Sequence, residues 1–151
     1  MITIIAIGKK REDWVMPGIE RYQKRLRPPF NIEWALLPHS SLEYDAARKE
    51  ESDRIRKRLP DGAYVILLDE RGKGLSSGGL SAMLSDGAAM SRDTYVVIGG
   101  AYGVDDELTG QANFVLSLSA MVFPHQMVRL LLTEQIYRAQ EIARGGKYHH
   151  E

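Results

Sequence analysis

The stretch YVVIGGAYGVDDELTGQANFVLSL, residues 95–118, determines the fold class. It holds two short apolar runs, residues 95–98 and 114–118, of the kind that form buried strands. A glycine-rich segment and a short helical segment near residues 105–108 lie between them. Strands that alternate with helices pair in parallel, because a crossover connection returns the chain to the same end of the sheet. The stretch therefore predicts an α/β fold.

The same alternation continues on both sides of this stretch. Further strands are expected at residues 3–7, 32–37 and 64–68, and helices at residues 13–26, 45–59, 80–90 and 125–144. A loop with several glycines is expected after residue 68. No linker or internal repeat interrupts the pattern. We expect one domain, residues 1–151, with a three-layer α/β architecture and a mostly parallel sheet.

The final predicted helix is apolar over an unusually wide arc. Pro124 suits its first position, and Gly145-Gly146 ends it. In its first turns, apolar residues occupy more than one face, and such a helix has to be covered on two sides. We attribute the second side to another subunit.

Composition excludes several classes of function. The 151 residues include no cysteine, which rules out a disulfide scaffold, a thiolate nucleophile and a cysteine-bound metal. Twenty basic residues balance twenty acidic ones, so no global positive field draws the chain to nucleic acid. The histidines do not show metal-ligand spacing, so no metal is expected. No apolar run is long enough to span a membrane, and no secretory signal is present, so we expect a cytoplasmic protein without membrane contact.

Ligands of parallel α/β sheets bind beyond the carboxyl ends of the strands. At these ends lie Leu68-Asp69, Gly99-Gly100 and Leu118-Ser119, the last of them within the uncharged segment 117–124. The glycine segment either makes a tight turn or lets a ligand approach the backbone. A dinucleotide loop is the weaker alternative, because the pattern is G-G-x-x-G and no acid follows about 20 residues later. The segment 117–124 either encloses an adenine or methionine-like group or simply leads from strand to helix.

Two further features have both a functional and a structural interpretation. The tail KYHHE, residues 147–151, is either a solvated terminus or a segment that becomes ordered on RNA, with Tyr148 stacking on a base. Residues 9–27 hold seven lysines and arginines against three acids. This local excess fits a modest nucleic-acid footprint or a solvated surface.

Together, five spaced motifs resemble the RlmH family. They are LLD at 67–69, IGGxxG at 98–103, LSLS at 116–119 with FPH at 123–125, Arg129 with EQIYRA at 134–139, and the Tyr148-His149 tail. The resemblance covers the whole chain and is most specific between Ser117 and His149. Members of this family are SPOUT-class enzymes that methylate N3 of a pseudouridine in 23S ribosomal RNA.

The resemblance implies more than the residue pattern does. It implies a C-terminal trefoil knot that binds S-adenosylmethionine (SAM), a homodimer, and a 23S rRNA substrate within the assembled ribosome. Carried over by motif, the cofactor-binding residues would be Leu68, Gly100, Ser119, Ala120, Met121, Val122, Phe123 and Pro124.

Removal of the N3 proton needs a base, or a cation that stabilises the resulting anion. Arg138 is the candidate cation, His149 the candidate base or hydrogen-bond partner, and Tyr148 the residue that stacks on or orients the nucleobase. Position 150 is usually Arg or Lys in the family and is His150 here, which weakens the positive charge at neutral pH. The alternative functions are a nucleotide- or dinucleotide-binding oxidoreductase and a non-catalytic ribosome-associated module.

Overall fold

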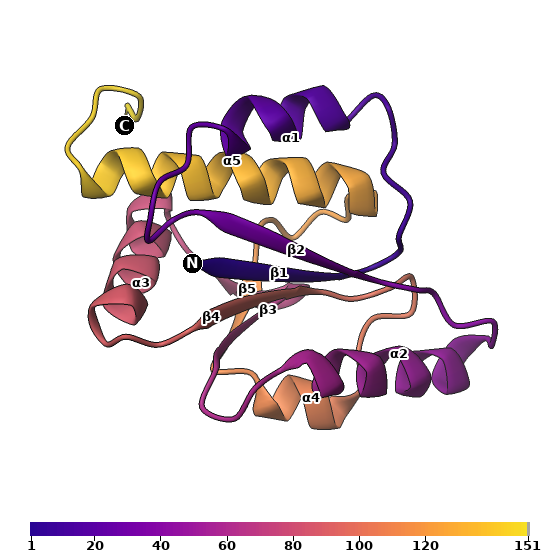
Figure 1. Cartoon of the computed structure of the whole chain (residues 1–151). Coiled ribbons are helices and arrows are strands. Elements are labelled where there is room, and N and C mark those ends of the chain that lie inside the picture. Colours follow the sequence, from indigo (N-terminus) through magenta and orange to yellow (C-terminus); the bar gives the residue numbers. More distant parts are fainter. Residues whose placement is uncertain (151) are drawn as a thin grey trace.

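A single sheet of five parallel strands forms the centre of the molecule, in the order β2-β1-β4-β3-β5 (Figure 1). The computed structural model describes residues 1–150. The strands are β1 (Ile2–Ile7), β2 (Ile32–Leu37), β3 (Tyr64–Gly74), β4 (Thr94–Ile98) and β5 (Phe114–Ser117). The predicted single α/β domain with a parallel sheet is therefore confirmed in its architecture.

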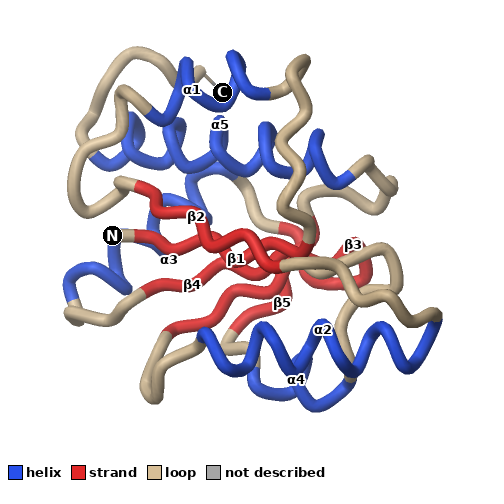
Figure 2. The backbone as a smooth tube through the Cα atoms, turned by 45° about the vertical axis from the view of Figure 1, so that its right-hand side comes forward, coloured by secondary structure: helices blue, strands red, loops and turns tan. Residues whose placement is uncertain are grey.

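Helices cover both faces of this sheet and make three layers. The first face packs against α2 (Tyr44–Arg58) and α4 (Asp106–Gln111), and the second against α1 (Met16–Gln23), α3 (Ser77–Ala89) and α5 (His125–Ala143). Figure 2 shows α1 and α5 on one side of the strands and α2 and α4 on the other. Successive side chains of a strand point to opposite faces, so Ile4 joins one apolar core and Ile5 the other. A strand buried on both sides reads as a continuous apolar run, which is why β1 was recognisable.

The wide apolar arc of α5 is covered only in part within the same chain. Helix α5 packs on α1 and α3 as well as on the sheet. Leu132 and Ile136 are buried in the core, and the Leu130 side chain lies against Gly18 of α1. Leu130 and Leu131 nevertheless stay half-buried, so the attribution of the second side of the helix to another subunit stays a prediction.

Strand β3 is longer than expected. The prediction ended it at Leu68 and placed a loop after it, whereas the strand runs to Gly74. Its register with β5 breaks between Leu68 and Lys73, and pairing resumes at Lys73 and Gly74. At Gly72 the backbone passes so close to β5 that a Cβ would lie 2.5 Å from the Val115 carbonyl oxygen. Gly72, one of the glycines that indicated a loop, thus allows two backbones to approach closely.

The other boundaries differ from the prediction by a few residues. Helix α1 falls furthest below its predicted length. It ends early because a turn-rich segment follows Gln23 and leads into the prolines at 28 and 29. Within residues 1–150, no helix is both long and apolar enough to span a membrane. The trefoil knot implied by the resemblance stays a prediction.

Candidate functional site

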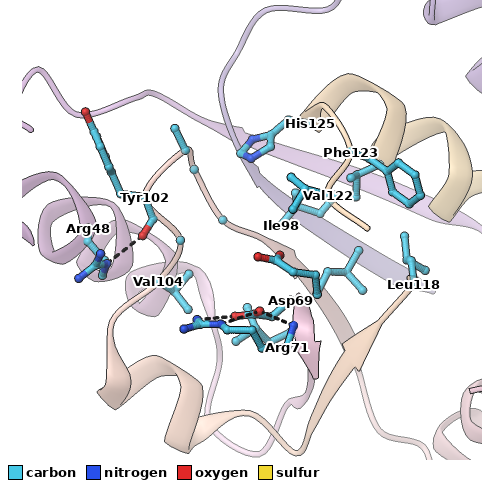
Figure 3. Close-up of a pocket in the computed structure, with 18 of the residues that line it drawn as sticks. Arg48, Asp69, Arg71, Ile98, Tyr102, Val104, Leu118, Val122, Phe123 and His125 are labelled. Atoms are coloured by element: carbon cyan, nitrogen blue, oxygen red, sulfur yellow. Dashed lines mark hydrogen bonds and ion pairs between the residues drawn. The ribbon is translucent and has the colours of Figure 1, made fainter. Parts of the chain in front are cut away.

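Three strand tips meet around one cavity at the carboxyl edge of the sheet. The cavity measures about 810 Å³ and is lined from β3 by Leu67, Leu68 and Asp69, from the end of β4 by residues 98–106, and beyond β5 by residues 118, 119 and 121–123. Figure 3 shows Leu118, Val122 and Phe123 on one side of it and the Asp69–Arg71 pair on another. The expectation that these tips lie together therefore agrees with the structure.

Most of the predicted cofactor-binding residues line this cavity. They are Leu68, Gly100, Ser119, Met121, Val122 and Phe123. Ala120 and Pro124 belong to the same loop but are not among the residues that line the cavity. Their assignment, like that of the other six, stays a prediction about binding.

The loop between β5 and α5 holds itself in place with its own serines. The Ser117 hydroxyl donates to the Ser119 carbonyl oxygen over 2.9 Å, and the Ser119 hydroxyl accepts from the Met121 amide over 3.0 Å. The side chains of Met121 and Val122 are 73% and 78% exposed, so the loop presents apolar surface at the cavity mouth. The two serines shape a turn, which leaves the loop uncharged and able to wrap an apolar or aromatic group.

Helix α2 fixes the glycine loop on the opposite side. The Arg48 Nε donates to the Tyr102 carbonyl oxygen over 2.8 Å (Figure 3). The ring centroids of Tyr44 and Tyr102 lie 5.3 Å apart. Gly103 closes the loop by donating to the Gly100 carbonyl oxygen over 3.0 Å. The loop is thus a tight turn and a cavity wall at once, and the approach of a ligand to its backbone stays a prediction.

Carboxylates outnumber cations around the cavity. Five acids and two arginines line it. The guanidinium of Arg71 lowers the pKa of Asp69, and that of Arg56 lowers the pKa of Asp105, so both carboxyls are ionised at neutral pH. Glu70 and Asp106 form no ion pair with any residue in 1–150. The rim therefore favours a positively charged ligand over one with phosphates.

A polar group lies behind the cavity where α5 begins. Burial, together with the positive charge of Arg129, lowers the pKa of the cavity-lining His125, so its ring is neutral at pH 7. The buried Arg129 donates to the carbonyl oxygens of Gly8 (2.7 Å) and Lys10 (3.1 Å) and so ties α5 to the end of β1. Glu51 is 3% exposed and accepts from the Ser40 amide over 2.9 Å. These bonds connect the start of α5, the end of β1 and α2 behind the cavity.

The three predicted catalytic residues form a second group around Glu134. Arg138 donates to Glu134 Oε1 through Nε (3.0 Å) and Nη2 (2.7 Å), and the Tyr148 hydroxyl donates to the same oxygen over 3.1 Å. The Arg138 guanidinium also lies over the Tyr148 ring, 4.7 Å from its centroid. Glu134 raises the pKa of Arg138, and burial raises that of Tyr148, so Arg138 stays charged and Tyr148 stays neutral.

The side chain of His149 contacts Arg138. Arg138 Nη1 lies 3.1 Å from His149 Nδ1. A guanidinium can only donate, so Nδ1 accepts in this arrangement. Its basic lone pair is therefore engaged by Arg138. His149 could take a substrate proton only after leaving Arg138. His150 is exposed and next to this group, and Glu151 lies outside the described residues.

The cavity and the Arg138 group lie at opposite ends of α5. His125 lines the cavity and Arg138 is 13 residues further on, a separation of about 20 Å along the helix. Figure 1 shows the C-terminus beside the last turns of α5, on the same side of the sheet as α1 and away from the start of α5. The chain thus brings the cofactor candidates together and the catalytic candidates together, but it does not join the two groups.

Two residues that matter in this geometry were missed at the sequence level. Glu134 was quoted only as part of a motif, although it holds both Arg138 and Tyr148. Its spacing of four residues before Arg138 on a helix was the available signal. Glu51, which lies against Gly100, had no such signal, because it sits in a helix that reads as a solvated surface.

Comparison with known proteins identifies the family of this chain. A family model described as "Predicted SPOUT methyltransferase" covers residues 1–149. The chain is 42% identical to ribosomal RNA large subunit methyltransferase H of Acetivibrio thermocellus, over 98% of each chain. It is 40% identical to the protein of the same name from Geotalea daltonii, over 99% of each chain.

Solved structures show the same fold at low identity. A methylase family protein from Neisseria gonorrhoeae aligns with a TM-score of 0.55 at 13% identity, covering 90% of this chain and 81% of that one. TrmJ from Z. mobilis ZM4 aligns with a TM-score of 0.54 at 12% identity, covering 93% and 70%. The fold and the sequence matches agree, and the chain belongs to the SPOUT methyltransferase family, among the relatives of ribosomal RNA large subunit methyltransferase H.

Proposed function

We propose that this protein is a SAM-dependent methyltransferase that methylates N3 of a pseudouridine in 23S rRNA within the assembled ribosome. The observation that carries the proposal is the cavity where the tips of β3, β4 and β5 meet, with an uncharged loop on one side and carboxylates on the rim. The names of the relatives, ribosomal RNA large subunit methyltransferases, support the substrate class. The resemblance supplies the target atom.

The cavity residues fit SAM in size and in chemistry. About 810 Å³ lies within the usual range of small-molecule sites. Leu118, Val122 and Phe123 offer apolar surface to an adenine, and the loop beside them offers backbone groups. SAM carries a sulfonium and an ammonium, so the acidic rim attracts it. NAD carries two phosphates, which the same rim repels. Charge thus favours SAM over the dinucleotide of the oxidoreductase alternative.

When bound, SAM would supply a methyl group that N3 of the pseudouridine takes directly, with the sulfur as leaving group, so no covalent intermediate on the protein is needed. The chain's task is to orient the uracil ring and to stabilise the charge left when N3 loses its proton. Arg138 is charged and positioned by Glu134, which suits it to stabilise that anion or to hold a phosphate. Tyr148 is neutral and half-buried, which suits it to orient the base.

A homodimer would join the two separated groups. The cavity and the Arg138 group are about 20 Å apart along α5, farther than a single nucleobase can bridge. We therefore propose that the tail of one copy completes the cavity of another. The argument rests on this separation.

The test is methyl transfer from labelled SAM to ribosomes that lack the modification. Incorporation should occur on the large subunit and map to N3 of one pseudouridine. Calorimetric titration should show binding of SAM and not of NAD. Binding of NAD alone would favour the oxidoreductase, and SAM binding without methyl transfer would favour the non-catalytic module. A ribosomal substrate also supports the proposal that the protein acts in the cytoplasm.

A further inference from the structure

One edge of the molecule carries exposed cations that lack acidic partners. Six of them, here called the basic strip, flank or belong to α1: Lys9, Lys10, Arg11, Arg21, Lys24 and Arg25. All six are exposed, and none forms an ion pair with any residue in 1–150. Charges that are neither buried nor paired contribute little to folding. Their positions therefore call for another explanation.

The opposite layer has the reverse balance. Residues 43–61 and 101–112, which contain α2 and α4, hold six cations against nine acids. Four of those six cations are ion-paired: Arg48 with Asp45, Lys49 with Asp53, Arg54 with Glu50, and Arg56 with Asp53 and Asp105. Residues 8–33 hold seven cations against four acids. The protein is thus neutral as a whole but positively charged along α1, so a polyanion would approach from that side.

The basic strip spans the length of α5 and meets both groups described above. Near the start of α5, the Lys10 carbonyl oxygen accepts from Gln126 and Arg129. Near its end, the Gln140 side chain donates to the Arg25 carbonyl oxygen over 3.1 Å. The Tyr22 ring on α1 contacts Tyr137, whose ring contacts Tyr148 of the tail, with centroid distances of 5.7 and 4.8 Å. An RNA strand lying on α1 would therefore lead directly to the Arg138 group.

An exposed aromatic ring lies within the same surface. Trp14 is 56% exposed and falls between Arg11 and Arg21 in the chain. Its indole nitrogen donates to Glu12, which holds the ring against the surface. Cations interleaved with an exposed aromatic ring favour nucleic acid, since phosphates pair with the cations and a base can stack on the ring.

We propose that the basic strip, with Trp14, is the surface that binds the phosphate backbone of the ribosomal RNA and delivers it to the Arg138 group. This inference rests on the proposed function and adds the place at which the RNA is held. The cavity rim, being acidic, would repel the same backbone. The charge distribution therefore separates RNA binding from cofactor binding on the surface of one small domain.

The test compares two triple variants of equal charge in the full chain. The first, Arg21→Gln/Lys24→Gln/Arg25→Gln, removes three cations of the basic strip. The matched control, Lys49→Gln/Lys57→Gln/Arg58→Gln, removes three exposed cations of α2. Binding to unmodified ribosomes is measured by co-sedimentation over a range of salt concentrations. SAM affinity by calorimetry and oligomeric state by light scattering are measured on the same samples.

We expect the first variant to bind ribosomes at least about tenfold more weakly at low salt, with a salt dependence reduced by about 2 to 3 in log–log slope. The control should bind like wild type, and both should bind SAM like wild type. Equal ribosome binding by the two variants would overturn the proposed surface. So would a change of oligomeric state confined to the first variant, because α1 would then contact another copy. Failure of the wild type itself to methylate ribosomes refutes the proposed function instead.

Discussion

Substitution of Gly100 by alanine tests the packing behind the cavity. An alanine Cβ at this position would lie 3.1 Å from the Glu51 Cδ and 3.2 Å from the Ile7 Cγ2, with the Glu51 carboxylate oxygen Oε1 closer still. Gly100 does not have a positive φ, so the alanine backbone itself is unstrained. The added methyl therefore points into buried protein and not into the cavity. Any loss comes from the collision with Glu51.

Overpacking of this kind costs about 1 to 3 kcal/mol, because Glu51 is buried and its other oxygen is held by the Ser40 amide. In a domain of this size that loss lowers the melting temperature by about 2 to 12 °C. Urea denaturation of wild type, G100A, Glu51→Ala and the double variant gives a double-mutant cycle. We expect G100A to cost less in the Glu51→Ala background, with a coupling of about 1 kcal/mol or more.

The contradicting result is an equal loss of stability in both backgrounds, or no loss at all. Either outcome would mean that contact with Glu51 is not the reason why position 100 holds glycine. SAM affinity of the folded variants should be measured in parallel. An unchanged affinity in G100A would remove Gly100 from the set of residues whose size matters for the ligand. The larger Gly100→Val change would add to the same collision.

Three further predictions concern the tail and the cavity. Glu134→Gln should lower the rate of methyl transfer at least about tenfold and leave SAM affinity unchanged, because Arg138 and Tyr148 lose the charge that positions them. Initial rates on ribosomes and SAM titration measure this, and a wild-type rate in the variant would refute the positioning role. Deletion of residues 147–151 should abolish methylation and preserve SAM binding, since the tail lies far from the cavity along α5; full activity in the truncated protein would show that the tail is dispensable. The pKa of His125 in the folded state lies below the ordinary value of 6.5, so the unfolded chain takes up the proton first as the pH drops, and the free energy of unfolding should fall as the pH passes 6.5. Urea denaturation at pH 7.5 and 5.5 should show this loss of stability, and the loss should be smaller in His125→Asn.

The sequence by itself determined the fold class and identified part of the cavity lining. Buried strands such as β1 and β4 are apolar along their whole length, so local pattern alone locates them and predicts a parallel sheet. Because ligands bind at the carboxyl ends of such strands, Leu68, Gly100 and the loop after β5 could be named without coordinates. The resemblance added residues of the tail that no periodicity indicates.

Only the tertiary structure decided how these parts are arranged. The extension of β3 to Gly74, the cover of α5 by α1 and α3, and the contact of Glu51 with Gly100 all join residues far apart in the sequence. The separation of the Arg138 group from the cavity likewise follows from the straight path of α5 across the sheet. Local sequence sets which face of an element is apolar, but the packing of elements sets what that face meets.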